Sequence, residues 1–414
     1  MPGARSDEPE RASALSSTID YRALSLKVPH GIGTFASPVV ERLRHGDVGR
    51  LAPRVVAGGL VAFAILYIAV ITNPPPEVGL GNWRTTTYGS AIDDPGSFLA
   101  VLLDAITFAG LLFVVASGFS LIFGLMRVVN MAHGSFYLLA GYIAYEVQQE
   151  QTGLEGGFAI PGSDVNTWEW VLPLLVAAGT VAVVGLIVQQ LLLSWNHGQD
   201  LRQALITIAV SVIVADQIIA HFPRSSGFQV GGGQAVSMTW PGWTERRVDL
   251  QLWGVEYSLA RLVMLAIGVG VGIALYMWLY RTKTGMVIRA GVDDRQMTSA
   301  IGINIQKAFA IAFVVGAALA AVGGVIGSSQ ASVGAGQDAQ WLLNSLVVVI
   351  IGGMGSLIGA AAGSLLYAAV LTFSASYLPL AGDDCCTQYS IVLTFALMAF
   401  VLAFRPQGLF GRAG

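Results

Sequence analysis

The sequence predicts an all-α protein, a polytopic transmembrane helix bundle with about ten membrane segments, one of them short and either broken or re-entrant. Three observations lead to this fold class. Of the 414 residues, 54% are hydrophobic and only 11% are charged, whereas about a quarter of a soluble domain is charged. Apolar runs of about 20 residues, the length that spans a bilayer, recur along the chain. The basic residues gather in alternate loops between these runs.

Each predicted membrane segment is a mostly apolar run bounded by polar loops. The eighth run is short and ends in a cluster of glycines, a composition typical of a helix that breaks where protein or water surrounds it. In the ninth, glycines four residues apart predict close contact between helix backbones. The segments are 55–72, 98–124, 131–149, 171–194, 203–222, 258–280, 308–330, 341–353, 356–378 and 389–405.

Residues 1–54 differ from the rest of the chain. They carry 8 basic side chains and no apolar run, which predicts a disordered basic tail. If this tail lies in the cytoplasm, 17 of the 22 basic residues fall on the cytoplasmic side, as the positive-inside rule requires. Both termini are therefore expected in the cytoplasm. Residues 55–96 would form one extra helix and an outer loop ahead of the main domain.

Several enzyme signatures are absent from the sequence. It contains no G-x-x-x-x-G-K-[ST], no G-x-S-x-G and no H-E-x-x-H, and its histidines lack the spacing of metal ligands. Cys385 and Cys386 are adjacent, so two unpaired thiols or one unusual local bridge is expected. We therefore expect that the chain is not an enzyme and binds no metal ion or cofactor.

A polar hinge joins the second and third segments. Asn130 and His133 can hydrogen-bond backbone groups freed at the helix break, and Gly134 allows close helix approach. A structural hairpin capped by these residues is the simpler interpretation, and contact with a transported substrate is the alternative. Asn344, just before the glycine cluster, could face a pore. The candidate residues of a substrate path are Asn130, His133, Gly134, Asn344, Gly352 and Gly353.

The inner connection 281–307 contains one short amphipathic pattern. Met297, Ala300 and Ile301 recur at helical spacing, which predicts a short helix with one apolar face. Two aspartates suit the N-terminus of this helix, which carries partial positive charge, and Gly302 suits its C-terminus. By itself the loop is an inert connector, and a docking element for a partner is the alternative. Its candidate residues are Arg289, Ala290, Asp293, Asp294, Met297, Ala300 and Gly302.

Two carboxylates lie within predicted membrane segments. Asp104 and Asp216 are costly in lipid and are expected to face a cavity or a partner. A proton relay is one interpretation of them. We favour the other, in which they lie near helix ends or form hydrogen bonds within the bundle.

Four short motifs, taken in order, resemble the membrane-spanning permease subunit of branched-chain amino acid (Liv-type) ABC importers. The resemblance covers residues 97–411, which it identifies as an ABC importer permease domain. The motifs are Gly124…Asn130-Met-Ala-His-Gly134, Arg289-Ala290…Ala300-Ile-Gly-Ile303, Leu346…Gly352-Gly-Met-Gly-Ser356 and Phe404-Arg-Pro-Gln-Gly-Leu-Phe-Gly411.

The resemblance implies a bacterial cytoplasmic membrane protein that carries branched-chain or other small apolar amino acids. It implies as partners a paralogous permease subunit, two cytoplasmic ATPase subunits that bind ATP-Mg, an extracytoplasmic substrate-binding protein and membrane lipid, but no nucleic acid. The inner loop would then be the segment that couples transport to the ATPases. Asp104 and Asp216 stand where uncharged amides are expected. An importer of urea, short amides or organic acids, or a proton-coupled secondary transporter, therefore remains an alternative.

Overall fold

The structure is a computed structural model of the chain. It describes residues 95–126, 129–153, 165–196, 199–221, 235–249, 255–377 and 387–411. The predicted tail 1–54, the predicted first helix 55–72 and the two cysteines lie outside the described residues.

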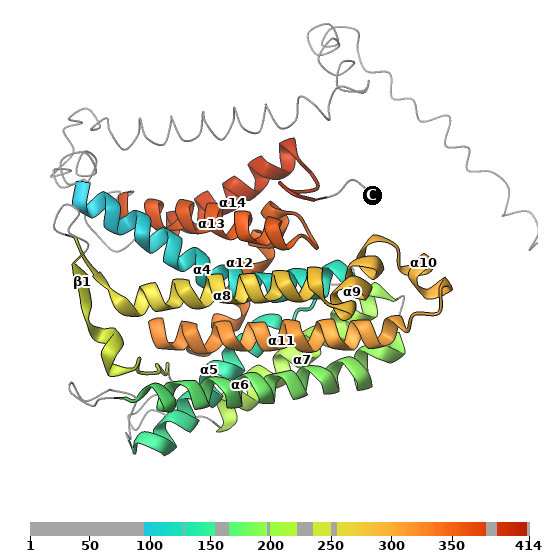
Figure 1. The fold of residues 1–414 in the computed structure, drawn as a ribbon, viewed down its shortest axis with the longest axis horizontal. Coiled ribbons are helices and arrows are strands. Elements are labelled where there is room, and N and C mark those ends of the chain that lie inside the picture. The colour runs from blue at the N-terminus through green and yellow to red at the C-terminus, as the bar shows by residue number, and fades with distance from the viewer. Residues whose placement is uncertain are drawn as a thin grey trace, which may run out of the picture. The chain divides into compact units, whose positions relative to one another are not determined.

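The described residues form a bundle of helices, which confirms the predicted fold class. In Figure 1 the long helices lie side by side, with α9 and α10 at one end of the bundle and strand β1 at the other; these are called the α10 end and the β1 end below. The helices are α4 (Pro95–Met126), α5 (His133–Thr152), α6 (Thr167–Ile187), α7 (Asp200–His221), α8 (Leu259–Arg281), α9 (Lys283–Asp293), α10 (Arg295–Ala300), α11 (Ile305–Gln330), α12 (Gln337–Gly352), α13 (Leu357–Tyr377) and α14 (Thr387–Phe404).

Among the described residues, six helices are long and apolar enough to cross a membrane: α4, α6 with its continuation to Asn196, α7, α8, α11 and α13. The continuation of α6 is a π-helical turn, η1 (Val188–Leu193), followed by a short 3₁₀ turn, η2 (Ser194–Asn196). α5, α12 and α14 occupy the other predicted segments in this part of the chain, but they are shorter or less apolar. α12 has 16 residues and is about 24 Å long, too short to cross a hydrocarbon core of about 30 Å. The eighth predicted segment is therefore short, as its sequence indicates.

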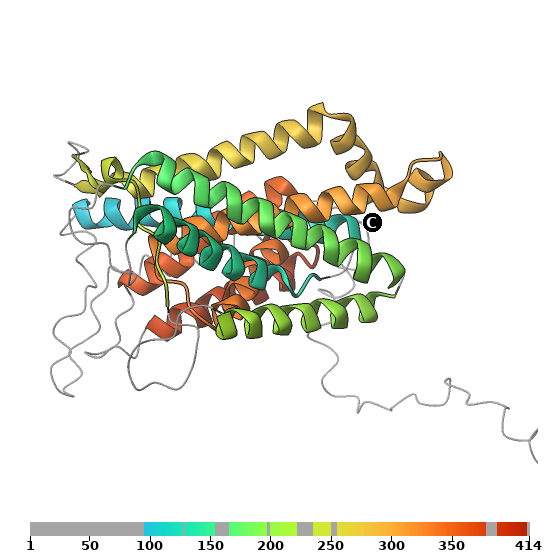
Figure 2. The ribbon, with the colours of Figure 1, turned by 90° about the horizontal axis from the view of Figure 1, so that it is seen from below.

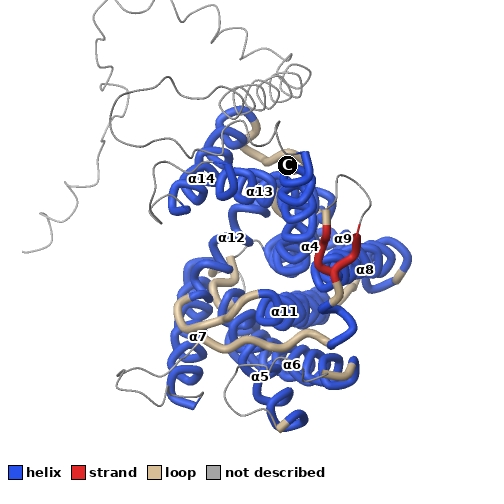
Figure 3. Tube along the Cα trace, turned by 90° about the vertical axis from the view of Figure 1, so that its left-hand side faces the viewer, coloured by secondary structure: helices blue, strands red, loops and turns tan. Residues whose placement is uncertain are grey.

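Helix α4 occupies the centre of the bundle because small residues let its neighbours approach closely. A Cβ atom on Gly118 would lie 2.6 Å from the carbonyl oxygen of Gly316 on α11. On the other side, a Cβ atom on Gly268 of α8 would lie 2.9 Å from the carbonyl oxygen of Gly110. Viewed from the β1 end, α8 and α13 lie on either side of α4, and α11 lies between α4 and the α5–α6 pair (Figure 3). Backbone contact of this kind is how helices pack inside a membrane.

Helices α7 and α8 lie on opposite sides of the bundle (Figure 2). Their outward faces are apolar and exposed, with Leu205 and Val212 on α7 and Val269 and Ile273 on α8 among the exposed side chains. A soluble bundle would place polar side chains on such faces. The pattern is that of helices surrounded by lipid or by another membrane subunit.

One small sheet departs from the all-α prediction. Strand β1 (Arg247–Asp249) pairs antiparallel with β2 (Glu256–Ser258), so that Arg247 lies opposite Ser258. The 3₁₀ turn η3 (Gly242–Glu245) precedes it. These strands of three residues are too short to leave an alternating pattern in the sequence, which is why sequence analysis missed them. β2 leads directly into α8 and so fixes the start of that helix.

The end of α12 is held by the last residues of the chain. The backbone amides of Leu409 and Phe410 donate hydrogen bonds of 2.9 Å to the carbonyl oxygens of Ile351 and Gly352. The chain turns sharply at Gly353 (φ 105°), where a side chain would also collide with Gly411. The carbonyl groups at a helix end need such partners, and the motif Phe404–Gly411 supplies them.

Candidate functional site

The hinge between α4 and α5 lies inside the bundle. The Nε2 atom of His133, the first residue of α5, donates a hydrogen bond to the carbonyl oxygen of Val115 on α4 (3.0 Å). Val115 lies eleven residues before Met126, where α4 ends, and therefore about 16 Å inside that end. α5 thus begins part-way along α4, and the hinge brings backbone polar groups to this depth.

Asn130 supports the first turn of α5. Its Oδ1 atom accepts a hydrogen bond from the amide of Ala132 (3.1 Å), and its carbonyl oxygen accepts one from the amide of His133 (3.2 Å). The side chain is only 3% exposed, and its Nδ2 atom has no hydrogen-bond partner among the described residues. Asn130 therefore holds the hinge and retains one unused buried donor.

His133 is fully buried at the same point. Its ring packs edge-on against Phe119, with 5.4 Å between the ring centroids. Because Nε2 donates to a carbonyl oxygen, the neutral ring leaves Nδ1 as an acceptor, and this atom finds no partner in the described part of the chain.

Helix α12 begins beside the start of α5. A Cβ atom on Gly134 would collide with the carbonyl oxygen of Asp338 in the first turn of α12, so only glycine fits there. One turn further along each helix, the rings of Tyr137 and Trp341 stack with 4.3 Å between centroids. The N-termini of two helices therefore meet within the bundle.

Hydroxyl groups and a carboxylate join these two helix starts to α7. The Oγ atom of Ser135 lies 2.7 Å from the Oγ atom of Ser211 on α7 and donates to the Oδ2 atom of Asp338 (3.3 Å). One turn earlier on α7, the Oγ1 atom of Thr207 accepts a hydrogen bond from the amide of Met131 (3.2 Å). Sequence analysis did not single out these four side chains. The sequence does show two hydroxyl side chains, Thr207 and Ser211, one turn apart on the mostly apolar helix α7, and this pattern could have indicated them.

The other predicted path residues lie further along α12. The Oδ1 atom of Asn344 accepts a hydrogen bond from the hydroxyl of Tyr367 on α13 (2.8 Å), which ties the two helices together. Gly352 packs against Gly359 of α13, and Gly353 forms the turn described above. The six predicted path residues therefore form two separate groups. Three lie at the hinge and the start of α5, and three lie between the middle of α12 and the turn that follows it.

Asp104 and Asp216 occupy different environments. The carboxylate of Asp104 on α4 is half-buried at the β1 end, where it pairs with Arg261 of α8 and accepts a hydrogen bond from the hydroxyl of Tyr257 (2.7 Å). Burial raises the pKa of Tyr257 in β2 to about 12, so this hydroxyl remains a donor at neutral pH. Asp216 is exposed on α7.

The predicted short helix in the inner connection is present as α10. The Oδ1 atom of Asp294 caps it by accepting a hydrogen bond from the amide of Met297 (2.9 Å), and Gly302 ends it with a φ of 83°. α9, which precedes it, was not predicted and begins where the Oγ1 atom of Thr282 accepts from the amide of Gly285 (3.1 Å). α9 packs back on the bundle, which places α10 at its end.

Some side chains of this segment hold α9 on the bundle, and others, mainly on α10, are exposed. The guanidinium group of Arg289 lies 4.3 Å from the ring centroid of Tyr280, a cation–π contact that fixes α9 on α8. The carbonyl oxygen of Ala290 accepts a hydrogen bond from the amide of Asp294 (2.9 Å). Asp293 and Ala300 are exposed. Met297 and Ile301 are 64% and 69% exposed, so the apolar face of α10 has no cover from the described residues.

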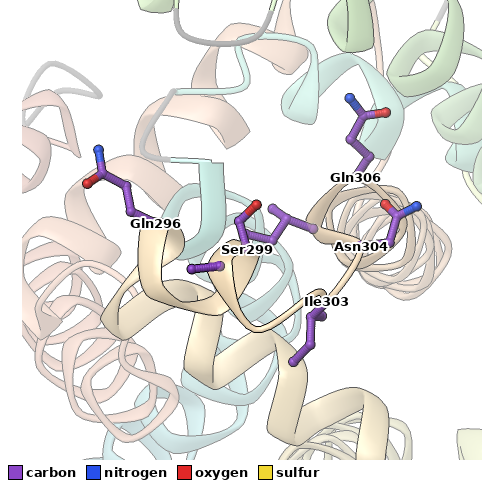
Figure 4. A pocket seen from close by; sticks show the side chains of 7 residues that line it. Gln296, Ser299, Ile303, Asn304 and Gln306 are labelled. Carbon is purple, nitrogen blue, oxygen red and sulfur yellow. The ribbon is translucent and has the colours of Figure 1, made fainter.

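A concave surface of about 860 Å³ lies between α10 and the start of α11 (Figure 4). The side chains that line it are mostly uncharged and polar, and they come from both elements. They are Gln296, Ser299, Ala300, Ile303, Asn304, Ile305 and Gln306. It lies next to the exposed apolar side chains of α10.

Comparison with known proteins gives one consistent result. Residues 101–402 match the family described as branched-chain amino acid transport system, permease component. The high-affinity branched-chain amino acid transport system permease protein BraD of Pseudomonas aeruginosa is 26% identical over 76% of this chain and 96% of its own length. LivH of Escherichia coli, which has the same description, is 25% identical over 76% of this chain and 96% of its own length. A solved structure, PsaBC from Streptococcus pneumoniae in complex with Fab, is similar at a TM-score of 0.40 with 9% identity, over 76% of this chain and 95% of that chain.

Proposed function

Because the chain belongs to the family of branched-chain amino acid transport system permease components, we propose that it is the permease subunit of an ATP-driven importer of branched-chain or other small apolar amino acids. The observation that carries this proposal is the match over residues 101–402, supported by relatives that align over nearly their whole length. The chain would form part of the translocation path and would hydrolyse nothing itself.

The α10 end is proposed to be the cytoplasmic end. In the described residues, basic side chains such as Arg281, Lys283 and Lys307 lie in or beside the α9–α10 segment at this end. By the positive-inside rule we propose that α10 faces the cytoplasm of a bacterial cell. A cytoplasmic position of both termini, expected from the sequence, belongs to the same proposal. Cysteine accessibility tests this orientation: in a background with Cys385→Ser and Cys386→Ser, the variant Ser299→Cys should be labelled by a membrane-impermeant reagent only after the cell membrane is permeabilised. Labelling in intact cells would reverse the orientation.

The exposed face of α10 is proposed to dock on a cytoplasmic ATPase subunit that binds ATP-Mg. Met297 and Ile301 supply the apolar contact, and the adjacent concave surface supplies amide groups for hydrogen bonds. ATP-driven closure of two ATPase subunits would then move this helix and, through α9, the bundle. A paralogous permease subunit, an extracytoplasmic substrate-binding protein and membrane lipid complete the proposed surroundings.

Uptake measurements test the proposed substrate class. Cells that lack this chain should lose high-affinity uptake of labelled leucine, and the intact gene should restore it. Excess valine or isoleucine should compete, whereas excess urea, a short amide or an aromatic acid should not. Unchanged leucine uptake in the deletion strain, together with lost uptake of one of these other compounds, would move the proposal to that substrate class.

The energy source separates this proposal from a proton-coupled transporter. Asp104 is paired with Arg261 and accepts a hydrogen bond from Tyr257, so its contacts are those of a structural carboxylate that joins α4 to α8. We therefore expect uptake into proteoliposomes that enclose ATP to stop when vanadate is enclosed together with the ATP. Uptake that survives vanadate but stops when the proton gradient is dissipated would support the secondary transporter instead.

A further inference from the structure

The junction of α5 and α12 presents unused hydrogen-bond donors inside the membrane bundle. The first-turn amides of a helix have no acceptor within the helix. In α5, the amide of His133 bonds to Asn130 and that of Phe136 bonds to Ala132, but the amides of Gly134 and Ser135 have no acceptor among the described residues. The Nδ2 atom of Asn130, buried against the same turn, is also unpartnered.

Two helix dipoles add partial positive charge near these donors. α5 runs toward the β1 end, where Gln148 bonds to the carbonyl oxygen of Thr239 (3.0 Å), and α12 runs the opposite way to Gly355, which contacts Gly124 near the end of α4. The two helices therefore direct their N-termini toward each other. The N-terminus of a helix carries a partial positive charge, and a pair of interrupted helices of this kind can hold a carboxylate at membrane depth.

The same junction contains a negatively charged group. The Asp338 carboxylate is half-buried at the start of α12, where it accepts the hydrogen bond from the hydroxyl of Ser135. In the described part of the chain, no basic side chain lies within ion-pair distance of it. The Nδ1 atom of His133 adds a buried acceptor without a donor. Unused donors and unused acceptors therefore lie within one turn of each other.

We propose that this junction is a binding subsite for the zwitterionic head of an α-amino acid. The carboxylate of the substrate binds the amides of Gly134 and Ser135 and the Nδ2 atom of Asn130, while its ammonium group binds the carboxylate of Asp338. Ser135 and Ser211 link the subsite to α7. The assignment rests on the proposed amino acid importer and goes beyond it by requiring both charges of the substrate during passage.

The proposal makes a distinction between substrates that the family assignment does not make. An organic acid lacks the ammonium group that would neutralise Asp338, and an amide offers the α5 donors a neutral carbonyl oxygen, a weaker acceptor than a carboxylate. Leaving Asp338 without a cation, or replacing a charge-assisted hydrogen bond by a neutral one, is unfavourable. The subsite would therefore reject molecules that carry only one of the two charges.

Thiol protection in the assembled transporter tests the subsite directly. In a background with Cys385→Ser and Cys386→Ser, the variant Ser211→Cys is alkylated with a small reagent in proteoliposomes that contain all subunits. We expect leucine to slow alkylation at least threefold, whereas leucinamide and 4-methylpentanoate at the same concentration do not. Adding Asp338→Asn should abolish the protection, and adding the matched change Asp216→Asn, on the exposed face of α7, should preserve it.

Leucine uptake by the same proteoliposomes separates the possible failures. We expect Asp338→Asn to lower uptake at least tenfold while the amount of assembled complex stays near that of the wild type, and we expect Asp216→Asn to keep wild-type uptake. If the wild type takes up leucine but leucine gives no protection, or if all three compounds protect equally, the subsite is wrong and the proposed function stands. Wild-type uptake by Asp338→Asn would also refute the subsite. If the wild type takes up no amino acid, the proposed function fails and the subsite fails with it.

Discussion

The exposed apolar face of α10 allows a quantitative test of the proposed ATPase docking. The perturbation is the pair Met297→Ala and Ile301→Ala, made singly and together. Full burial of such side chains contributes about 1.5–3 kcal/mol each. Since the two side chains are 64% and 69% exposed, about two thirds of that contribution is available to a partner. Alanine retains the β carbon, so we expect a loss of about 1 kcal/mol for each change.

This loss corresponds to roughly fivefold weaker association with the ATPase subunit for each single variant and roughly thirtyfold for the double variant. The assay is a titration of the purified permease complex in detergent with its ATPase subunit, followed by uptake of labelled leucine in cells. The control is Met277→Ala, because Met277 is exposed on the membrane-spanning helix α8 and lies outside α10. We expect this control to bind and transport as the wild type does.

A double variant that binds the ATPase subunit within twofold of the wild type and transports normally would refute the docking surface. The same conclusion follows if Met277→Ala weakens binding as much as the α10 variants do. A charge in the same face gives a stronger perturbation. Ala300→Asp should abolish ATP-driven uptake while the protein still inserts into the membrane, and retained uptake would contradict the placement of the docking face.

Three further predictions concern the bundle itself. Gly134→Ala should destabilise the assembled protein by about 1–3 kcal/mol through overpacking against α12, whereas Gly179→Ala, with open space around its Cβ position, should not; thermal unfolding in detergent compares them, and equal midpoints would contradict the packing. Arg261→Met leaves the half-buried Asp104 without its cation and should cost about 1–2 kcal/mol, less than a fully buried pair would; an unchanged midpoint would show that the pair contributes nothing. Because burial raises the pKa of Tyr257 from 10 to about 12, its stabilising contribution should be complete below about pH 10 and be lost as the pH rises toward 12, so the midpoint should fall less between pH 9 and pH 11 in Tyr257→Phe than in the wild type.

Local composition was sufficient to predict most of the helices. Each apolar run in the described part of the chain became a helix, and the short run before Gly352 became the short helix α12. The α10 helix could also be predicted, because Asp294 and Gly302 act within a few residues of it. Helix capping and hydrophobic periodicity depend on residues close together in the chain, so they can be predicted from a single sequence.

The junction of α5 and α12 could not be predicted in the same way. The sequence pointed to Asn130 and His133, but the depth at which they lie depends on the contact between His133 and Val115. The hydrogen bond between Ser135 and Asp338 joins residues 203 positions apart. A contact across such a distance depends on how the helices pack, and no local pattern encodes it. The β1–β2 pair was missed because strands of three residues show no periodicity.

The return of the C-terminus to α12 closes a loop without a covalent bond. The chain leaves α12 at Gly352, passes through α13 and α14, and comes back to bond with Ile351 and Gly352 through Leu409 and Phe410. Three helices are thereby fastened at one point and would have to travel together in any rocking motion of the bundle. The same fastening makes this terminus a poor place for a truncation or a fused tag. Removing residues 405–411 would leave the carbonyl oxygens of Ile351 and Gly352 without these partners and would release the end of α12.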